Sequence, residues 1–268
     1  MNLNGTHIAL DWDGQRIALE YQWLRPEGVA ATSPLVVFLH EGLGSVAMWK
    51  DFPQRLFEVL QCRGLLMSRP GYGQSTPVAE GTRWEPDFLE RQATEVLPAA
   101  LETLGVDAHA QPVWLLGHSD GASIALIYAS ANPGLVAGVV TLAPHCFVED
   151  CTVDSIAALQ APAVRGPLIQ RLARYHQAPE AVFQAWSRIW LDGAFRAWSI
   201  ADRIPRIRCP VLAVQGLDDE YGTLEQIHSI ARALPGARLL ELEACGHSPQ
   251  RDQPQAVIEA INSLMNTH

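Results

Sequence analysis

The feature that most constrains this chain is a glycine-flanked serine between an apolar strand pattern and an Ala-rich helix pattern. The pentapeptide 117–121, with the sequence GHSDG, follows the apolar run 112–116 and precedes the helical segment 122–129. A serine on such a strand-to-helix turn has a strained backbone, and the residues two before and two after it must be very small. The following helix directs its N-terminal amides toward whatever the serine attacks. This context predicts that Ser119 is a nucleophile.

Strand and helix patterns alternate along the rest of the chain. We expect two antiparallel strands over 8–24, around a turn at Asp13-Gly14. Further apolar runs are typical of buried strands, at 35–39, 65–67, 113–116, 136–142, 211–214 and 238–242. Helical segments are expected at 52–60, 88–104, 119–131, 224–234 and 254–265. Because strands that alternate with helices require a mostly parallel sheet covered on both faces, we predict an α/β doubly wound fold with eight strands.

A long segment between Ala143 and Cys209 interrupts this alternation. It has a helical composition without a clear strand pattern, and a compact domain rarely leaves about sixty residues without structure. We therefore expect a small helical subdomain, inserted after the sixth strand. Its aromatic residues either pack inside the subdomain or, for one or two of them, face a substrate cavity; they are Phe183, Trp186, Trp190, Phe195 and Trp198.

Composition and charge restrict the classes of partner and location. The net charge of −10 argues against a nucleic-acid or anionic-membrane partner, and no stretch is apolar for long enough to span a bilayer. Residues 1–6 lack the basic and apolar regions of a signal peptide. The five cysteines form no C-x-x-C pair and indicate reduced thiols. We expect a cytoplasmic protein that binds no metal, because no Cys/His cluster appears, and needs no cofactor.

A serine nucleophile needs a base, usually a histidine, that a carboxylate orients. Ligands of parallel sheets bind beyond the carboxyl ends of the strands, so these partners should follow later strands. Asp218 and Asp219 follow the strand at 211–215, and His247 follows the strand at 238–242. The order Ser, Asp, His is the one expected for a nucleophile on a strand-to-helix turn. We predict His247 as the base and Asp219 as its partner, while Asp218 stays solvated or shapes the turn.

Two backbone N–H groups are expected to form an oxyanion hole near the serine. The first is that of Asp120, directly after the nucleophile. The second should come from the loop 40–45, with the sequence HEGLGS, whose glycines allow the backbone to approach a substrate closely. Gly42 is the first choice for this second donor and Leu43 is the reserve.

Together these elements resemble the α/β-hydrolase superfamily over essentially the full length of the chain. The resemblance implies an α/β-hydrolase core over 1–147 and 209–268, with a helical cap over 148–208. The finer features, a Ser-Asp-Gly turn and the segment 206–210, are similar to the biphenyl-hydrolase-like and menaquinone-pathway synthase relatives. The segments that carry the resemblance are the loop 40–45, the turn 69–75 (RPGYGQS, similar to R-G-x-G-x-S), the pentapeptide 117–121, the G-x-x-D at 216–219, and Gly246-His247.

Two acidic residues raise the question of substrate charge. The family usually has glycine where this chain has Glu41, and a carboxylate pointing inward there would repel a second negative charge. We expect Glu41 to turn away and pair elsewhere. The side chain of Asp120 either hydrogen-bonds within the turn or, together with Glu41, faces a substrate ammonium group. The second hypothesis favours amino esters and cationic acyl substrates.

The resemblance implies a serine hydrolase that acts on a small or medium carboxylic ester, thioester, lactone or amide through an acyl-enzyme. We expect Glu41, His145, Trp186 and Trp190 to line a mostly apolar substrate pocket. A carbon–carbon bond hydrolase or a menaquinone-pathway-type lyase would use the same three side chains. A non-catalytic small-molecule receptor is the alternative from another class. The expected partner is a small molecule, and the chain is expected to be a monomer or a homodimer.

Overall fold

The computed structural model describes residues 6–267, and a sheet of eight strands runs through it. The strands lie in the order β1-β2-β4-β3-β5-β6-β7-β8; the pairs β1–β2 and β2–β4 are antiparallel, and the other five pairs are parallel. This confirms the predicted α/β architecture. The strands are β1 (Thr6–Trp12), β2 (Gln15–Leu24), β3 (Leu35–Leu39), β4 (Arg63–Met67), β5 (Val113–His118), β6 (Gly138–Leu142), β7 (Val211–Gly216) and β8 (Arg238–Leu242).

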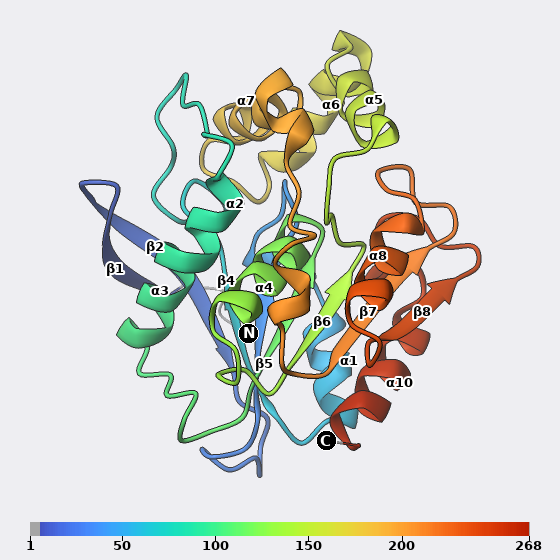
Figure 1. The fold of residues 1–268 in the computed structure, drawn as a ribbon. Coiled ribbons are helices and arrows are strands. Elements are labelled where there is room, and N and C mark those ends of the chain that lie inside the picture. Colours follow the sequence, from blue (N-terminus) through green and yellow to red (C-terminus); the bar gives the residue numbers. More distant parts are fainter. Residues whose placement is uncertain (1–5, 268) are drawn as a thin grey trace.

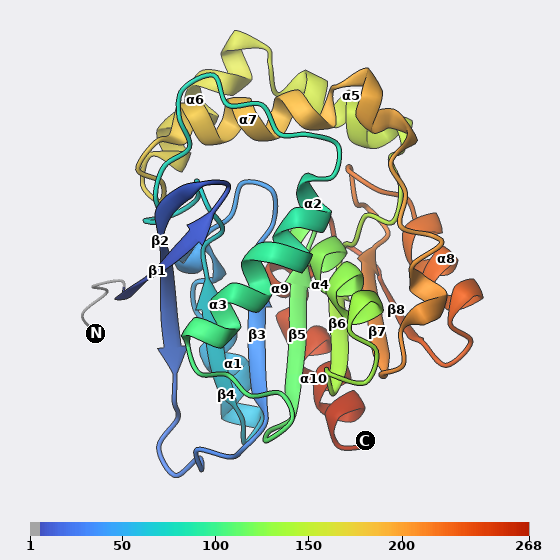
Figure 2. The ribbon, with the colours of Figure 1, turned by 60° about the vertical axis from the view of Figure 1, so that its left-hand side comes forward.

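Helices cover both faces of this sheet (Figures 1 and 2). On one face lie α2 (Phe88–Arg91), α3 (Leu97–Thr103), α4 (Asp120–Ala131) and α8 (Glu225–Ala233). On the other lie α1 (Phe52–Val59) and α10 (Pro254–Met265). A short 3₁₀ turn, Val46–Trp49, precedes α1, and a short helix, α9 (Pro249–Asp252), precedes α10.

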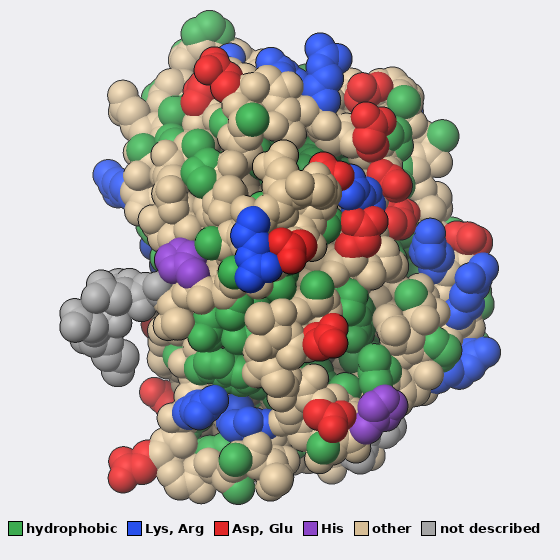
Figure 3. Space-filling model, turned by 90° about the vertical axis from the view of Figure 1, so that its left-hand side faces the viewer, with side chains coloured by type: hydrophobic (Ala, Val, Ile, Leu, Met, Phe, Trp, Pro, Cys, Tyr) green, Lys and Arg blue, Asp and Glu red, His purple; other side chains and the backbone are tan. Residues whose placement is uncertain are grey.

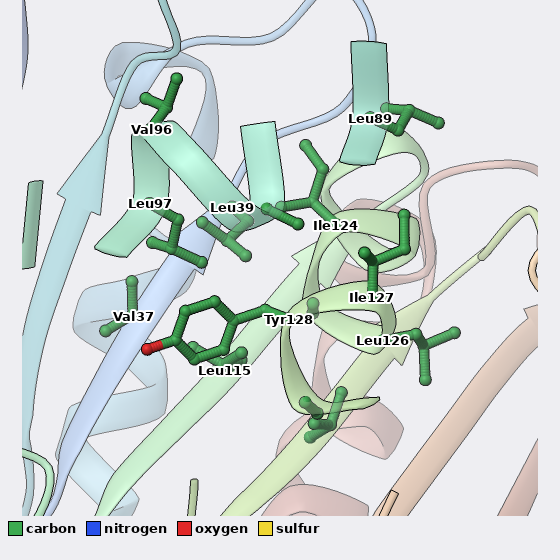
Figure 4. Packing of buried hydrophobic residues seen from close by; sticks show 14 of the residues in the cluster. Val37, Leu39, Leu89, Val96, Leu97, Leu115, Ile124, Leu126, Ile127 and Tyr128 are labelled. Atoms are coloured by element: carbon green, nitrogen blue, oxygen red, sulfur yellow. The ribbon is translucent and has the colours of Figure 1, made fainter. Parts of the chain in front are cut away.

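The continuous apolar runs are explained by burial of the strands on both faces. Val37 of β3 and Leu115 of β5 point toward α3 and α4, where they pack with Ile124 and Tyr128 (Figure 4). The alternate residue Phe38 belongs to the cluster on the α1 and α10 side. Side chains of a strand alternate between the faces, so both must be apolar when both are covered. Each such side chain contributes about 1.5–3 kcal/mol when fully buried.

Several predicted boundaries shift by one or two residues, and one predicted helix is irregular. The helix expected over 88–104 contains a π-helical turn, Gln92–Val96, between α2 and α3. Pro98, in the first turn of α3, has no N–H to donate to the preceding turn, so the regular hydrogen-bond pattern is interrupted there. Strand β6 begins at Gly138, two residues after the predicted start. The expectation about a signal peptide concerns residues 1–6, of which 1–5 lie outside the described residues.

The segment 148–208, which we call the cap, is helical as predicted. Figure 2 shows α5 (Asp150–Ala158), α6 (Pro162–Leu172) and α7 (Pro179–Trp190) lying across the end of the sheet where the parallel strands finish. The 3₁₀ turns Gly193–Ala197 and Ile204–Arg206 lead back to β7. The division of the chain into core and cap at these residue numbers stays a prediction.

The surface matches the acidic composition. On the face that Figure 3 draws, charges of both signs are present, and Asp and Glu side chains gather in its upper right part. Among residues 6–267, no helix has both the length and the apolar character needed to cross a membrane.

The turn between β5 and α4 has the tight geometry that its sequence predicts. Ser119 has a φ of 52°, in the left-handed region that side chains rarely adopt. A Cβ added to Gly117 would overlap the carbonyl of Gly121, and one added to Gly121 would overlap the carbonyl of Leu39. Both glycines are therefore required by the close approach of α4 to the strand ends.

Replacing one of these glycines tests this packing. Gly117→Ala is expected to lower the free energy of unfolding by about 3 kcal/mol or more, because backbone atoms cannot move aside as a flexible side chain would. Gly193→Ala is the control, since Gly193 is exposed and nothing lies within 4 Å of the added Cβ. Its effect should stay within about 0.5 kcal/mol in the same urea titration. Equal stability of the two variants would contradict the steric explanation.

Candidate active site

Ser119, His247 and Asp219 are connected by hydrogen bonds. The Oγ–H of Ser119 donates to Nε2 of His247 at 2.9 Å. The Nδ1–H of His247 donates to Oδ1 and Oδ2 of Asp219 at 2.8 and 2.9 Å. Because an ionised carboxylate only accepts, Nδ1 carries the imidazole proton and Nε2 keeps its lone pair. The hydroxyl proton therefore already points at a base.

The ends of three parallel strands bring these side chains together. Ser119 follows β5, while Asp219 and His247 lie on the loops that follow β7 and β8. These two loops touch each other directly, since a Cβ on Gly216 would overlap the carbonyl of Cys245. The missing side chain of Gly216 permits this close approach, and the Asp218 N–H donates to the carbonyl of Cys245 at 2.9 Å across it.

Asp219, and not Asp218, faces His247. The Asp219 carboxylate is fully buried and also accepts from Gln215 Nε2 at 2.6 Å and from the N–H of Tyr221 at 2.9 Å. Burial raises the pKa of Asp219, but the hydrogen bonds from His247 and Tyr221 lower it below the usual value. Asp218 is exposed and uses its N–H on the carbonyl of Cys245. The geometry thus brings Asp219, the predicted partner, to His247 and leaves Asp218 in solvent.

Three backbone N–H groups around Ser119 have no acceptor among residues 6–267: those of Gly42, Leu43 and Asp120. The carbonyl of Glu41 accepts from His40 Nδ1–H at 2.7 Å, Arg69 Nη2–H at 2.9 Å and the Gly44 N–H at 3.0 Å. This carbonyl and the Gly42 N–H belong to one planar peptide, so three donors on the oxygen fix the direction of the N–H. No comparable set of bonds holds the Leu43 N–H, which favours Gly42 over Leu43.

His40 is a site residue to which the sequence assigned no role of its own. Its Nδ1–H holds the Glu41 carbonyl, and its Nε2 accepts from the N–H of Arg69 at 3.0 Å. Both ring nitrogens are occupied in the neutral form, so a second proton has no place. Burial, assisted by the charge of Arg69, lowers the pKa of His40 well below 6.5.

The side chain of Asp120 pairs with Arg69, a partner that neither sequence hypothesis named. Nη1 and Nη2 of Arg69 both lie 3.3 Å from Oδ2 of Asp120, and the two side chains are 8% and 1% exposed. The guanidinium also lies over the ring of Tyr72, 4.5 Å from its centroid. Burial raises the pKa of Asp120, and Arg69 opposes that shift. The signal for Arg69 was its place at the start of the turn 69–75.

Glu41 turns toward His118, yet it still lines the pocket. Its Oε2 lies 3.4 Å from Nδ1 of His118, while the Nε2–H of His118 donates to the carbonyl of His247 at 2.6 Å. Although burial raises the pKa of Glu41, the contact with His118 lowers it to about 2. The side chain is therefore an ionised carboxylate, 25% exposed.

A pocket of about 470 Å³ opens at Ser119 between the strand ends and the cap. It gathers every residue predicted for the oxyanion hole or the pocket, whereas Asp219 lies behind His247. Thr152, Ile156 and Tyr221 were not predicted; the signals were the position of Tyr221 two residues after Asp219 and the one-turn spacing of the other two on α5. The lining residues are Glu41, Gly42, Leu43, Ser119, Asp120, His145, Thr152, Ile156, Trp186, Trp190, Tyr221 and His247.

Aromatic rings from the core and the cap surround the pocket. The ring of His145 lies 5.6 Å from that of His247 and 5.0 Å from that of Trp190. Burial lowers the pKa of His145 to about 3, so this imidazole is neutral. The indole of Trp186 occupies the space beside Gly42, where an added Cβ would overlap its Nε1. Trp186 and Trp190 are also buried, so lining the pocket and packing the cap are compatible.

His176, between α6 and α7, joins the cap to the core. Its Nε2–H donates to the carbonyl of Leu43 at 2.9 Å, and its Nδ1 accepts from the N–H of Gly73 at 2.9 Å. The next residue, Gln177, donates its N–H to the carbonyl of Gly73 at 3.1 Å. Burial lowers the pKa of His176, which keeps the ring in the neutral form these bonds need. No pattern in the sequence indicates this contact.

Residues 6–267 contain no cluster of His, Cys, Asp and Glu suited to a metal ion. The expectations of no metal and no cofactor stay predictions.

Comparisons with known proteins concern the family and the fold of the chain. The sequence profile described as "Alpha/beta hydrolase family" matches residues 36–260. A 2-hydroxy-6-oxononadienedioate/2-hydroxy-6-oxononatrienedioate hydrolase of Dechloromonas aromatica is 26% identical over 245 residues, covering 80% of this chain and 81% of that protein. Human monoglyceride lipase is 30% identical over 224 residues, covering 77% and 71%. The solved enol-lactonase of Burkholderia xenovorans LB400 has a TM-score of 0.74 at 17% identity, covering 97% of this chain and 100% of that one.

The buried histidines predict a loss of stability in acid. His40, His145 and His176 have lowered pKa values in the folded protein, whereas the unfolded chain takes up protons below about pH 6.5. The stability that these neutral imidazoles contribute is therefore fully present above that pH. It is lost as the pH falls toward the pKa values of the folded protein. For His145, with a pKa of about 3, the free energy of unfolding should fall by about 2 kcal/mol between pH 7 and pH 5.

Urea titrations at the two pH values check this. The pH-dependent loss should be smaller by about 2 kcal/mol in His145→Gln than in the parent protein. His109→Gln replaces an exposed imidazole and should keep the parental loss. If His145→Gln loses as much stability as the parent, His145 is not held neutral by burial.

Proposed function

Because the chain belongs to the alpha/beta hydrolase family, we propose that it is a serine hydrolase acting on a small or medium carboxylic ester. The observation that carries this proposal is the hydrogen-bonded series Ser119–His247–Asp219 at the base of a pocket, beside unpaired backbone N–H groups. A thioester, a lactone or an amide would be cleaved with the same groups.

In the proposed acylation step, Oγ of Ser119 attacks the carbonyl carbon of the ester while its proton moves to Nε2 of His247. Asp219, which holds the other ring N–H, stabilises the imidazolium that forms. The carbonyl oxygen becomes negative and accepts hydrogen bonds from the N–H groups of Gly42 and Asp120. One such donor contributes about 10²–10³-fold to the rate in serine hydrolases.

The tetrahedral intermediate then breaks its bond to the alcohol. The imidazolium of His247 returns the proton to the leaving oxygen, and the acyl group remains on Ser119 as an ester. A water molecule, deprotonated by the same imidazole, attacks this acyl-enzyme in the second half of the cycle. The acid leaves and the Ser119 hydroxyl is restored.

The runner-up reactions differ from this one in the bond that is broken. The similarity to the dioate hydrolase of Dechloromonas aromatica supports a carbon–carbon bond hydrolase as the second candidate. In a menaquinone-pathway-type lyase, Ser119 would take part in proton abstraction and no acyl-enzyme would form. A receptor would bind its ligand without reaction. Labelling of Ser119 by a fluorophosphonate separates the receptor from the enzymes, since the probe reacts with an activated serine.

Location and assembly are part of the same proposal. We place the protein in the cytoplasm, acting on a small-molecule substrate as a monomer or a homodimer without a nucleic-acid or membrane partner. The acidic net charge and the free cysteines support this placement.

A matched pair of variants tests the assignment of the carboxylate. Asp219→Asn is expected to lower kcat for p-nitrophenyl butyrate by about three orders of magnitude, because the amide no longer fixes the His247 tautomer. Asp218→Asn, one residue away and exposed, should keep kcat within about threefold of the parent. Ser119→Ala should abolish turnover and labelling. Parental turnover in Asp219→Asn would refute this mechanism.

A series of p-nitrophenyl esters from acetate to decanoate would then define the acyl length. The aromatic, largely apolar pocket favours short and medium chains, so kcat/KM should pass through a maximum and fall for the longest esters. If no ester of the series is hydrolysed while the fluorophosphonate still labels Ser119, the carbon–carbon hydrolase becomes the leading candidate.

A further inference from the structure

The wall of the Ser119 pocket contains two carboxylates. Glu41 and Asp120 are among the described residues that line it, and none of these is Lys or Arg. A charged ligand that enters this pocket therefore meets these two carboxylates. Whether the pocket tolerates a further anion depends on the cations nearby.

Arg69 lies beside the pocket, and both of its terminal nitrogens already contact acceptors, whereas its Nε is buried without a partner among the described residues. Nη1 and Nη2 contact Asp120, and Nη2 also donates to the carbonyl of Glu41. The guanidinium is 8% exposed and lies over Tyr72. It balances the charge of Asp120 and is not among the residues that line the pocket.

The remaining charge in the wall is that of Glu41. This carboxylate is 25% exposed, and its neighbour His118 already donates its Nε2–H to the carbonyl of His247. His145, on the other side of the pocket, is a neutral imidazole beside Trp190. A second carboxylate would lose its hydration here without gaining an ion pair, and it would lie near Glu41.

We infer that this pocket rejects acyl compounds that carry a carboxylate and takes up esters that carry no negative charge. The inference rests on the proposed function and names the substrate class for it. An ester or hydroxyl end of the substrate enters without giving up ionic hydration. A carboxylate end and an ester end are similar in size. The two classes of substrate therefore differ in the free energy that is needed to remove that end from water.

Binding without turnover tests this inference. In Ser119→Ala, the fluorescence of Trp186 and Trp190, which line the pocket, reports uptake of dimethyl succinate and monomethyl succinate at pH 7. The two ligands differ by one methyl group and one charge. We expect the uncharged diester to bind about tenfold more tightly or better, and the ratio to shrink at least threefold when Glu41→Gln is added. Glu220→Gln, the same charge change at an exposed position, should leave the ratio unchanged.

Equal affinity for the two ligands, tighter binding of the monoester, or no binding of the diester at millimolar concentration would overturn the inference. An unchanged ratio in the Glu41→Gln protein would also overturn it. Hydrolysis of the diester by the parent protein is measured separately. Selective binding without hydrolysis would refute the proposed function and leave the charge selectivity standing.

A second inference comes from a different observation, the two hydrogen bonds of His176. The imidazole holds the carbonyl of Leu43, in the loop that supplies the Gly42 N–H, and it is itself held by the N–H of Gly73. These bonds cross from the cap to two core loops. We propose that His176 is a positioning residue through which the cap fixes the oxyanion loop. This proposal, too, rests on the proposed function.

The test compares variants that remove or replace these bonds. His176→Leu removes both and is expected to lower kcat about tenfold with little change in KM, and to speed amide hydrogen exchange of residues 42–45. His176→Gln, which offers an acceptor and a donor, should restore part of both. Tyr175→Phe, which removes only the hydroxyl that accepts from Lys50, is the control and should match the parent.

Parental kcat and parental exchange in a folded His176→Leu protein would overturn this second proposal. If that variant does not fold, His176→Asn, whose shorter amide cannot reach both partners, is measured instead, and parental exchange in it would overturn the proposal. Because hydrogen exchange does not require turnover, a failure of the ester assay alone would count against the proposed function and not against the link between cap and loop.

Discussion

The buried ion pair between Arg69 and Asp120 is the interaction on which the site depends. Taking two charges out of water costs several kcal/mol, which is offset here by two contacts to one oxygen and by the bond to the Glu41 carbonyl. The guanidinium thereby connects three segments: the loop after β3, the turn after β4 and the first residue of α4. Arg69 thereby holds the carbonyl of Glu41, which shares a peptide with the Gly42 N–H. It also holds the side chain of Asp120, whose N–H is the other predicted oxyanion donor.

Around this pair, buried imidazoles connect the loops of the site. His40 and His176 each use one nitrogen as donor and the other as acceptor, and each connects loops far apart in the sequence. His118 and His145 lie beside the ring of His247, with Tyr221 on another side at 4.8 Å between ring centroids. Such a cluster limits the rotation of the His247 ring.

The parts of this molecule that local rules determine could be predicted from the sequence. Steric constraints at Gly117 and Gly121 act within a few residues, so the serine turn was recognisable from its own pattern. The spacing of the apolar residues predicted the strands. Asp219 and His247 were then expected at the edge of the sheet where the parallel strands end. Asp219 was predicted over Asp218, and the directions in which the two carboxylates point became visible only in the structure.

Contacts between distant segments were beyond the reach of such rules. The Arg69–Asp120 pair spans 51 residues and the His176–Leu43 bond spans 133, so neither leaves a periodic signal. The π-helical turn directly precedes α3 and packs against α4, an element distant in the sequence. The fold class was thus accessible from sequence, together with the nucleophile and base as hypotheses, whereas the supporting contacts became visible only in three dimensions.

The contact between Gly42 and Trp186 has a consequence for how such a pocket diversifies. Gly42 has no need of glycine for its own backbone angles, because its φ does not lie in the left-handed region. Its missing side chain is the volume that the indole of the cap occupies. Gly42 of the core and Trp186 of the cap therefore have complementary volumes. A larger residue at position 42 requires a smaller one at position 186, so the two positions should vary together among relatives, although 144 residues of sequence separate them.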